Sequence, residues 1–417
     1  MTDPTGSERR PPRTTVQLLT DRTFGPWFAG LLISNSGNWL FNVTAAVVVF
    51  QVSGSALQVG LVSVAQFVPL VLIGPFAGAL LDRFDRRRIL LGSQLVSVSA
   101  ASALALAAVV LGVEAFPGAW PVILAAGGIG IGQAVAAPAL NALVPALVDD
   151  VDLESGVALT SLTFNVGRAL GPAASGVVLA TLGAEVAFIA NAASFLALIG
   201  ALLVIRIVPR TLDRDGDRSV RAGLRFVRAD RATLLLLLGV ATVGASADPA
   251  ITLSPPMAAV LGGSDTLTAV FVSAFGIAAA PAALLAGRLT RARGGWRIAA
   301  VGGLTTATGL GTVAVAPVAW VAVVGFGLTG AGFVLGVTGF TTMLQRRIPD
   351  ELRGRVMALW SVAFLGNRPL AAAVDGALSD AVGPRLAMVL AITIALGGVL
   401  VALRLRDRLD PSPVEGR

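Results

Sequence analysis

The stretch FNVGRALGPAASG at 164–176 returns 200 residues later as FLGNRPLAAAVDG at 364–376, with phenylalanine, arginine, leucine, alanine and glycine at the same five places. Each copy holds one arginine, Arg168 or Arg368, inside an apolar run long enough to cross a bilayer. A duplicated sequence with one charge inside each copy is typical of a membrane transporter built from two pseudo-equivalent halves. The repeat therefore predicts the fold and raises the question of what the protein transports.

The composition places the whole chain in a membrane. Of its 417 residues, 55% are hydrophobic and only 13% are charged, and the mean hydropathy is +0.82. So little polar surface cannot cover a soluble protein of this length. The apolar runs are roughly 20 to 27 residues long, whereas a transmembrane barrel shows alternating segments of about ten residues. We therefore predict an all-α integral membrane protein.

The apolar runs predict twelve transmembrane helices in two six-helix halves. Their approximate ranges are 24–50, 56–81, 89–112, 119–144, 155–182, 184–206, 232–260, 265–287, 298–317, 319–345, 355–380 and 384–404. The expected domains are a cytosolic tail at 1–23, the first half at 24–206, a cytosolic linker at 207–231, the second half at 232–404 and a cytosolic tail at 405–417. Arginines of the linker recur at helical spacing opposite apolar residues, which predicts an amphipathic helix there.

The basic residues are all arginines, and they gather on one side of the predicted membrane. They occupy both tails, the linker and the loops after the second, eighth and tenth spans, which leaves only Arg168, Arg368 and Arg385 elsewhere. The positive-inside rule makes that side the cytosol. The first tail lacks the apolar core and cleavage site of a signal peptide. We therefore expect both termini in the cytosol.

Several residue types are missing, and their absence excludes whole classes of chemistry. The chain has no Cys, His, Tyr or Lys. Metal ligation by Cys or His, histidine acid–base catalysis, Schiff bases and a P-loop are therefore excluded. We expect no cofactor, no metal and no enzymatic activity. The protein would take the energy for transport from an ion gradient or merely facilitate diffusion. The scattered basic loops contain no nucleic-acid binding module, so no nucleic-acid partner is expected.

A second repeat lies in the loops after spans two and eight, where AGALLDRFDRRRI at 77–89 matches AGRLTRARGGWRI at 286–298. The first copy resembles the loop signature of the major facilitator superfamily, which is filled here by Gly78, Leu80, Asp82, Arg83, Arg86 and Arg87. Asp85 stands where that signature usually has glycine. Three other stretches, SGNW at 36–39, NVGRALGP at 165–172 and PDELRGRVM at 349–357, are similar to the branch that includes the enterobactin exporter and many actinobacterial efflux proteins.

The loop signature has two interpretations. Asp82 can accept hydrogen bonds from the N-terminus of a neighbouring helix, so that the loop latches the cytosolic side shut in one conformation. Alternatively, the arginines only hold the loop inside the cell.

The fifth span also resembles a known motif. Gly167, Arg168, Gly171, Pro172 and Gly176 match the antiporter motif of the superfamily, although Ser175 replaces one of its glycines. This resemblance implies export. Without it, small residues at this spacing indicate close helix packing.

Charges inside the spans are the candidate functional residues. An arginine near a helix centre costs about 2.5 to 3.5 kcal/mol, so Arg168 and Arg368 are expected to face protein or water. They bind an anionic or carbonyl-bearing substrate, or they form structural ion pairs. Asp248, next to Pro249, is the best placed carboxylate for proton coupling, and its alternative role is a helix cap at a proline break. Asp375 lies nearer the outer end, where it could simply be solvated.

Polar and aromatic residues within the spans complete the predicted site. Asn38, Trp39 and Asn165 represent a lining that mixes amides with aromatic rings, which suits an amphipathic organic molecule. Acids at the span ends, including Asp380, need no special role. We expect a monomeric, proton-coupled exporter of a drug, siderophore or secondary metabolite in the cytoplasmic membrane of a bacterium. The alternatives are a proton-symport importer of a small organic solute and, in another class, a membrane scaffold or membrane-embedded enzyme.

Overall fold

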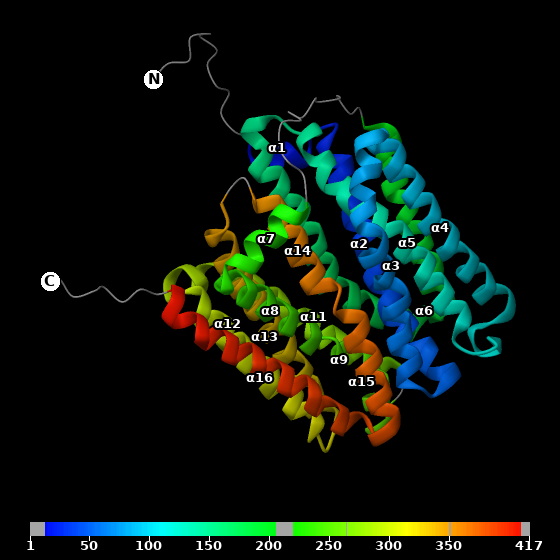
Figure 1. The fold of residues 1–417 in the computed structure, drawn as a ribbon. Coiled ribbons are helices and arrows are strands. Elements are labelled where there is room, and N and C mark those ends of the chain that lie inside the picture. The colour runs from blue at the N-terminus through cyan, green and yellow to red at the C-terminus, as the bar shows by residue number, and fades with distance from the viewer. Residues whose placement is uncertain (1–12, 206–219, 264, 350–351, 410–417) are drawn as a thin grey trace, which may run out of the picture.

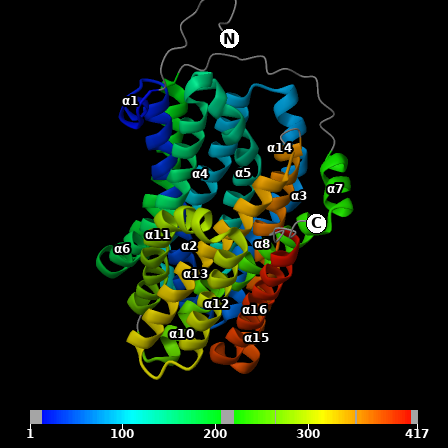
Figure 2. The same cartoon turned by 90° about the vertical axis from the view of Figure 1, so that its left-hand side faces the viewer.

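The computed structural model describes residues 13–205, 220–263, 265–349 and 352–409, and the regular structure in these ranges is entirely helical. The helices form two bundles that lean against each other (Figure 1). Figure 2 shows the second bundle from its outer side, with α12 and α16 next to one another. The all-α prediction is confirmed for the described part of the chain.

The first bundle begins with the short helix α1 and contains five long helices. Their bounds are α1 Thr15–Leu19, α2 Phe24–Ser53, α3 Ala56–Arg83, α4 Arg86–Leu111, α5 Trp120–Leu143 and α6 Leu153–Val204. Helix α6 contains the predicted spans five and six, which join at Gly183 with a φ of 84°. Because this left-handed backbone favours glycine, the chain can reverse there without strain. Gly383, 200 residues later, makes the equivalent turn with a φ of 88°.

The second bundle follows the linker. Its helices are α7 Val220–Ala229, α8 Arg231–Ser246, α9 Pro249–Thr252, α10 Ser254–Val260, α11 Asp265–Arg293, α12 Gly295–Ala314, α13 Ala319–Arg347, α14 Arg353–Leu365, α15 Arg368–Val382 and α16 Pro384–Leu409. Two of the predicted spans contain helix breaks. Span seven consists of α8, α9 and α10, and span eleven consists of α14 and α15. The predicted linker is helical from Val220. Linker residues 207–219 lie outside the described ranges.

Within the described residues, nine helical segments are long and apolar enough to cross a membrane. The predicted spans 24–50, 155–182 and 298–317 are helical but are not among these nine. The first of them carries a series of asparagines, serines and glycines, which lowers its hydropathy. The count of twelve spans and the domain boundaries therefore remain predictions.

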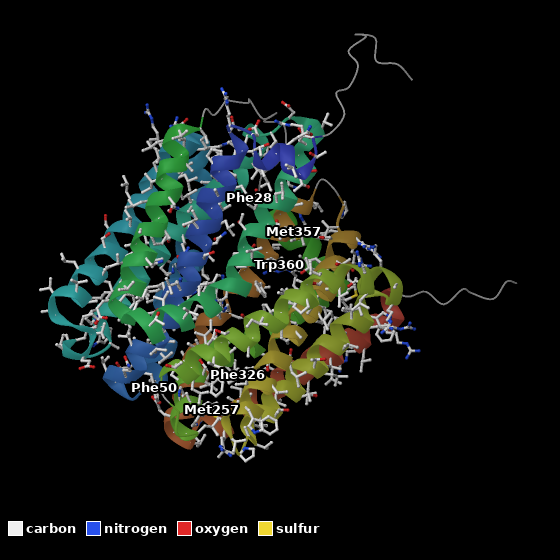
Figure 3. All side chains as sticks on the ribbon, turned by 180° about the vertical axis from the view of Figure 1, so that it is seen from behind. Phe28, Phe50, Met257, Phe326, Met357 and Trp360 are labelled. Carbon is white, nitrogen blue, oxygen red and sulfur yellow. The ribbon has the colours of Figure 1, made fainter. Side chains whose placement is uncertain are left out.

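Each bundle has its own apolar core. Phe41, Phe188 and Ile129 are buried in the first bundle, and Phe271, Phe326 and Phe340 are buried in the second. Figure 3 shows Phe28 close to the end of the molecule where the chain begins, and Phe50 and Met257 close to the other end. We call the end that carries α1, α7 and the last turn of α16 the terminal face, and the other end the opposite face.

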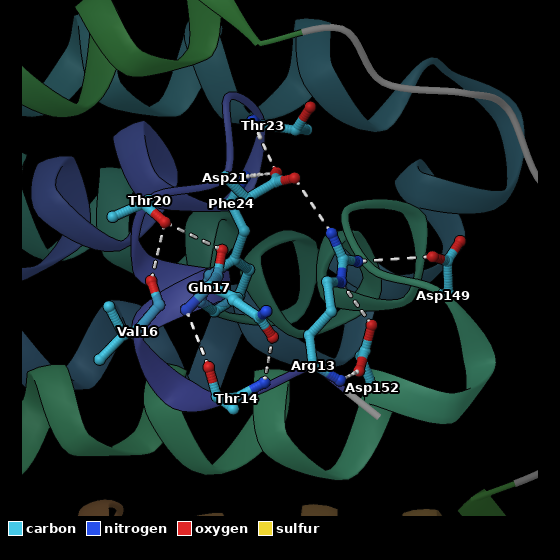
Figure 4. A network of polar contacts seen from close by, with 10 residues as sticks. All are labelled: Arg13, Thr14, Val16, Gln17, Thr20, Asp21, Thr23, Phe24, Asp149 and Asp152. Atoms are coloured by element: carbon cyan, nitrogen blue, oxygen red, sulfur yellow. Dashed lines mark hydrogen bonds and ion pairs between the residues drawn. The ribbon is translucent and has the colours of Figure 1, made fainter. Parts of the chain in front are cut away.

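At the terminal face, Arg13 ties the start of the chain to the loop before α6. Its Nε donates to Asp152 at 2.6 Å, Nη1 to Asp21 at 3.0 Å and Nη2 to Asp149 at 3.5 Å (Figure 4). Asp21 also accepts from the backbone N–H groups of Thr23 and Phe24, at 2.8 and 2.9 Å, and so covers the N-terminus of α2. The network anchors the first long helix to the loop between α5 and α6.

The two bundles meet along two seams near the opposite face. In the first seam α3 packs against α15, where a Cβ on Gly60 would lie 2.3 Å from the carbonyl oxygen of Ala372. In the second seam α6 packs against α11, and Gly176 lies against Ala269. Both contacts depend on glycine having no side chain, because a larger residue would push the helices apart.

Candidate functional site

The candidate site is built on two helix breaks in the second bundle. Helix α8 ends at Ser246, and the chain resumes as α9 with Pro249 in its first turn. Asp248 occupies the N-cap position, but its side chain makes no capping hydrogen bond. The alternative role of Asp248 as a helix cap is therefore wrong in this structure, and its carboxylate is available for other contacts.

The second break has the same sequence pattern, a charged residue followed by proline. Helix α14 ends at Leu365, and α15 begins at Arg368 with Pro369 in its first turn. Proline donates no hydrogen bond, and its ring clashes with the carbonyl four residues earlier, so the helix cannot run through unchanged. The Asn367 side chain donates to the carbonyl of Ala241 at 2.5 Å, which holds this break against α8.

The breaks bring Arg368 and Asp248 together. Arg368 Nε lies 3.5 Å from Asp248 Oδ1, and the side chains are 15% and 0% exposed. Thr252 donates to the other carboxylate oxygen, Oδ2, at 2.7 Å. Oδ1 has no hydrogen-bond partner among the described residues. The ring of Phe67 on α3 lies 4.7 Å from the guanidinium of Arg368, so the first bundle also contacts this cation.

Asp375 lies two turns further along α15. The expectation that solvent could surround it is wrong, because only 2% of the residue is exposed. Its Oδ2 has no hydrogen-bond partner in the part of the chain that the structure describes. The second bundle therefore buries two carboxyl groups, Asp248 before α9 and Asp375 within α15, and holds the partly buried guanidinium of Arg368 at the start of α15.

Three connected hollows lie beside this charge cluster, and Arg368 lines two of them. The innermost, of about 40 Å³, is mostly apolar, and its wall includes the rings of Trp39, Phe164, Phe275, Phe333 and Phe364. The second, of about 210 Å³, lies mainly within the first bundle, and Arg368 and Leu365 are the residues that the second bundle adds to it.

The third hollow, of about 630 Å³, forms a wide mouth. It is lined by Thr160 and Ser161 near the start of α6, by Thr342 and Gln345 near the end of α13, and by Trp360. These helix ends belong to the terminal face, so the cavity opens there. Trp360 stacks on Phe364 with 4.9 Å between the ring centroids, which connects the mouth to the innermost hollow.

The candidate residues of the first bundle divide into two groups. Trp39 lines both inner hollows, and Asn38 lines the second and accepts a hydrogen bond from Gln133 at 2.9 Å. The side chains of Asn165 and Arg168 lie outside the described part of the structure.

The antiporter-like motif of span five faces two different helices. Gly167 and Gly171 lie against α2, where a Cβ on Gly171 would come within 2.3 Å of the Cβ of Trp39. Pro172 and Gly176 face α11 instead, and the Pro172 carbonyl accepts a hydrogen bond from Ser273 at 3.1 Å. The motif thus packs one helix of its own bundle and one helix of the other.

The loop motif is only partly described. Gly78, Leu80, Asp82 and Arg83 belong to the last turns of α3, and of their side chains only that of Leu80, 38% exposed, is described. Asp85, which replaces the usual glycine, caps α4 by accepting from the backbone N–H of Arg88 at 2.9 Å. In the first turn of α4, which begins at Arg86, Arg87 donates to the carbonyl of Leu203 at 2.9 Å.

Sequence reasoning missed two residues. Gln94 on α4 lines the second hollow, and a lone amide within an apolar span is the signal that could have identified it. Asp380 binds the start of α3 across the first seam: it accepts from Ser55 Oγ at 2.6 Å and from the backbone N–H groups of Ala56 and Leu57 at 2.7 and 3.1 Å. The expectation that Asp380 has no special role is therefore wrong.

The fold and the cavity define a helical, multi-pass membrane transporter with its site between two bundles. The chain belongs to the transmembrane secretion effector family of the major facilitator superfamily, whose family profile matches residues 14–412. It is therefore a transporter and not an enzyme.

Related proteins include an exporter, a transporter and an efflux protein. The enterobactin exporter of Citrobacter koseri is 26% identical over 410 residues, which cover 95% of this chain and 96% of the exporter. The staphyloferrin A transporter of Staphylococcus aureus is 27% identical over 195 residues, or 46% of this chain and 48% of that protein. Macrolide efflux protein A of Streptococcus pyogenes is 25% identical over 222 residues, 51% and 52% of the two chains. The chain thus matches about half the length of the last two relatives.

Solved structures show the same fold. A bacterial homologue of the human lysosomal transporter Spinster, inward-facing and occupied, superimposes with a TM-score of 0.76 at 16% identity over 94% of this chain and all of its own. A bacterial homologue of the iron transporter ferroportin, in an inward-facing state, gives a TM-score of 0.70 at 15% identity, covering 94% of this chain and 99% of its own. At these identities the likeness concerns the fold alone.

Proposed function

We propose that this protein is a proton-coupled exporter of amphipathic organic compounds in the cytoplasmic membrane of a bacterium. Both termini then lie in the cytosol, and the cavity opens to the cytosol in this conformation. The observation that carries the proposal is the pair formed by Asp248 and Arg368. The carboxylate is buried, and Arg368 also lines both inner hollows. The efflux and secretion names of the relatives support the direction of transport.

The pair offers a physical basis for exchange. A proton can bind Asp248 at Oδ1 without breaking the hydrogen bond from Thr252, because that bond uses Oδ2. Protonation removes the attraction that holds Arg368, and the guanidinium is then free to move into the hollows that it lines. Loss of the proton draws Arg368 back and leaves that space to the cargo. Proton and cargo therefore exclude each other, as antiport requires.

A second function is supported by the same cation. An anionic solute that paired with Arg368 would take it away from Asp248 and favour the protonated carboxyl, so solute and proton would bind together. That linkage produces symport and describes an importer. The two functions differ in the sign of coupling, which an experiment can measure.

The test uses everted membrane vesicles whose interior has been acidified, with a pH-sensitive acridine dye as the reporter. A macrolide, enterobactin and staphyloferrin A serve as test compounds. An exporter of the proposed kind accumulates a compound inside these vesicles and releases protons from them. We expect Asp248→Asn to lower both signals more than about tenfold, because an amide cannot exchange a proton here.

Asp149→Asn is the matched control, since Asp149 is 64% exposed at the terminal face and far from the hollows. It is expected to keep both signals within about twofold. Proton-coupled efflux by Asp248→Asn at the wild-type rate would exclude a proton role for Asp248. Uptake into right-side-out vesicles driven by external acid would instead support symport.

A further inference from the structure

Several uncharged amide side chains line the second hollow. Asn38 and Asn42 come from α2, Gln66 from α3, Gln94 from α4 and Gln133 from α5, so four helices of the first bundle direct amides to one wall. Among the described side chains, Arg368 from the other bundle is the one charged group that lines this hollow. An amide both donates and accepts hydrogen bonds, and uncharged amides do not select an ion.

Gln94 stands out within this wall. Only 4% of the residue is exposed, yet its Oε1 has no hydrogen-bond partner among the described residues. A buried polar atom without a partner is costly, so such a group usually meets a ligand or water. Asn38 and Gln133, by contrast, satisfy each other through their 2.9 Å hydrogen bond. Gln94 therefore has an unused acceptor that is shielded from solvent.

The wall next to Arg368 has the opposite character. The innermost hollow is formed by aromatic rings and aliphatic side chains, including Phe275, Phe333 and Phe364. Trp39 lines both hollows and joins the amide wall to the aromatic one. A molecule that fills both must carry a hydrogen-bonding end and an aromatic or branched apolar end.

We propose that the cargo site is bipartite: the amide wall, with Gln94 as a specificity-determining residue, binds an uncharged polyhydroxyl or polyamide group, and the aromatic hollow binds an attached apolar body. This inference rests on the proposed export function and names its substrate class. A neutral polar end also agrees with antiport, because it leaves Arg368 paired with Asp248 when the cargo is bound.

The experiment measures binding without transport. The whole protein is placed in nanodiscs of phosphatidylethanolamine and phosphatidylglycerol, and equilibrium dialysis gives the Kd of two probes. One is 4-methylumbelliferyl glucoside, an aromatic ring with a neutral polyhydroxyl group. The other is its tetra-O-methyl derivative, which keeps the ring and loses the hydroxyl donors. Empty nanodiscs supply the background.

Wild-type protein is expected to bind the glucoside more tightly than the methylated probe. Gln94→Leu, of similar volume, is expected to weaken glucoside binding about three- to tenfold, as the loss of one hydrogen bond does, and to change binding of the methylated probe less than about twofold. Gln94→Asn keeps the amide, and its Kd for the glucoside is expected to lie between those of the wild type and Gln94→Leu. Gln58→Leu is the matched control, because Gln58 lies near the start of α3 and lines none of the three hollows.

Equal weakening of both probes by Gln94→Leu would overturn the specificity role, and so would no weakening of either. Wild-type binding of neither probe above empty nanodiscs would overturn the substrate class. Unchanged thermal melting of each variant confirms that it is folded. Because no proton gradient is present, failure here leaves proton-coupled export standing, and failure of vesicle transport with intact probe binding leaves the amide wall standing.

Discussion

The two copies of the opening repeat have the same length and the same arginine, yet they fold differently. In the first copy α6 is helical throughout residues 164–176, with Pro172 inside it. In the second copy the helix stops at Leu365 and starts again at Arg368. Proline occurs once in each copy, but Pro369 follows its arginine directly, whereas Pro172 lies four residues beyond Arg168. The position of one proline thus separates a packing helix from a broken one.

The break gives the second half a different chemistry. It positions Arg368 at the start of α15, beside Asp248 at the start of α9. The first half supplies amides to the cavity instead, and its glycines at 167 and 171 bring α6 close to α2. In the proposed mechanism, the first half binds the polar end of the cargo, and the second half carries the pair that couples transport to protons.

The largest effect on transport is expected from replacing Pro369, the proline that distinguishes the second copy. Pro369→Ala restores a backbone N–H and removes the ring that clashes with the carbonyl of Leu365, four residues earlier. We expect α14 and α15 to join, Arg368 to turn away from Asp248, and proton-driven transport in everted vesicles to fall about tenfold. Spin labels on cysteines at the exposed positions Ala358 and Ala377 would approach the spacing of a straight helix, about 28 Å between Cα atoms.

Pro281→Ala is the control, because Pro281 lies inside α11 and is exposed. It is expected to change transport less than about twofold. An unchanged bend and wild-type transport in Pro369→Ala would show that other contacts, such as the hydrogen bond from Asn367 to Ala241, make the break.

Much of the fold could be predicted because it depends on patterns that the sequence contains. Apolar runs and the 200-residue repeat predict a helical membrane protein in two halves, since a bilayer accepts few alternatives. The two helix breaks were harder to predict from the sequence. The adjoining pairs Asp248-Pro249 and Arg368-Pro369 indicate where a helix is weak, but proline inside a span also occurs without a break, as Pro172 and Pro281 show.

The contacts between the halves could not be predicted. Asp380 binds backbone N–H groups of α3, and every residue except proline has such a group, so no sequence pattern identifies the partner. The unpartnered oxygen of Gln94 likewise depends on how α4 is rotated toward the cavity. Residue types indicated that the cavity mixes amides with aromatic rings, whereas the gathering of amides from four helices around one hollow required the packed structure.

The seams between the halves provide a second test of the comparison, with a smaller expected effect. The seam between α3 and α15 has three hydrogen bonds to Asp380, and the seam between α6 and α11 has the bond from Ser273 to Pro172. Asp380→Asn keeps the shape but replaces one acceptor oxygen by a donor, which cannot serve the N–H groups of α3. We expect the population opened at the opposite face to rise about fivefold.

Because the chain has no cysteine, labels can be placed singly. Cysteines at the exposed positions Ala115 and Ala381, one in each half at the opposite face, carry the spin labels, and the fraction of long distances is measured. Ser273→Ala on the other seam removes one hydrogen bond and is expected to shift the population less. An equal or larger shift in Ser273→Ala would mean that Asp380 does not dominate the closure.

The smallest effect concerns two aspartates that start the first long helix of each half, Asp21 and Asp230, 209 residues apart. Asp230 accepts from the backbone N–H of Thr233 at 3.1 Å, and Arg347 contacts both of its oxygens, at 2.5 and 2.8 Å. Asp21 shares Arg13 with Asp149 and Asp152. The hydrogen bonds from Arg347 are the main cause that holds the pKa of Asp230 well below its ordinary value of 3.8.

A lowered pKa in the folded state means that the charged carboxylate adds stability above pH 3.8, and that this stability is lost only as the pH falls below that value. Asp230→Ala is therefore expected to cost about 1 to 2 kcal/mol, equally at pH 5.5 and pH 8. Asp21→Ala should cost less, because Arg13 keeps two other partners. Thermal melting of both variants in detergent at the two pH values measures this. A cost for Asp230→Ala that changed between pH 5.5 and 8 would place another titrating group at the cap, and an equal cost for both variants would show that the dedicated arginine adds nothing to the second half.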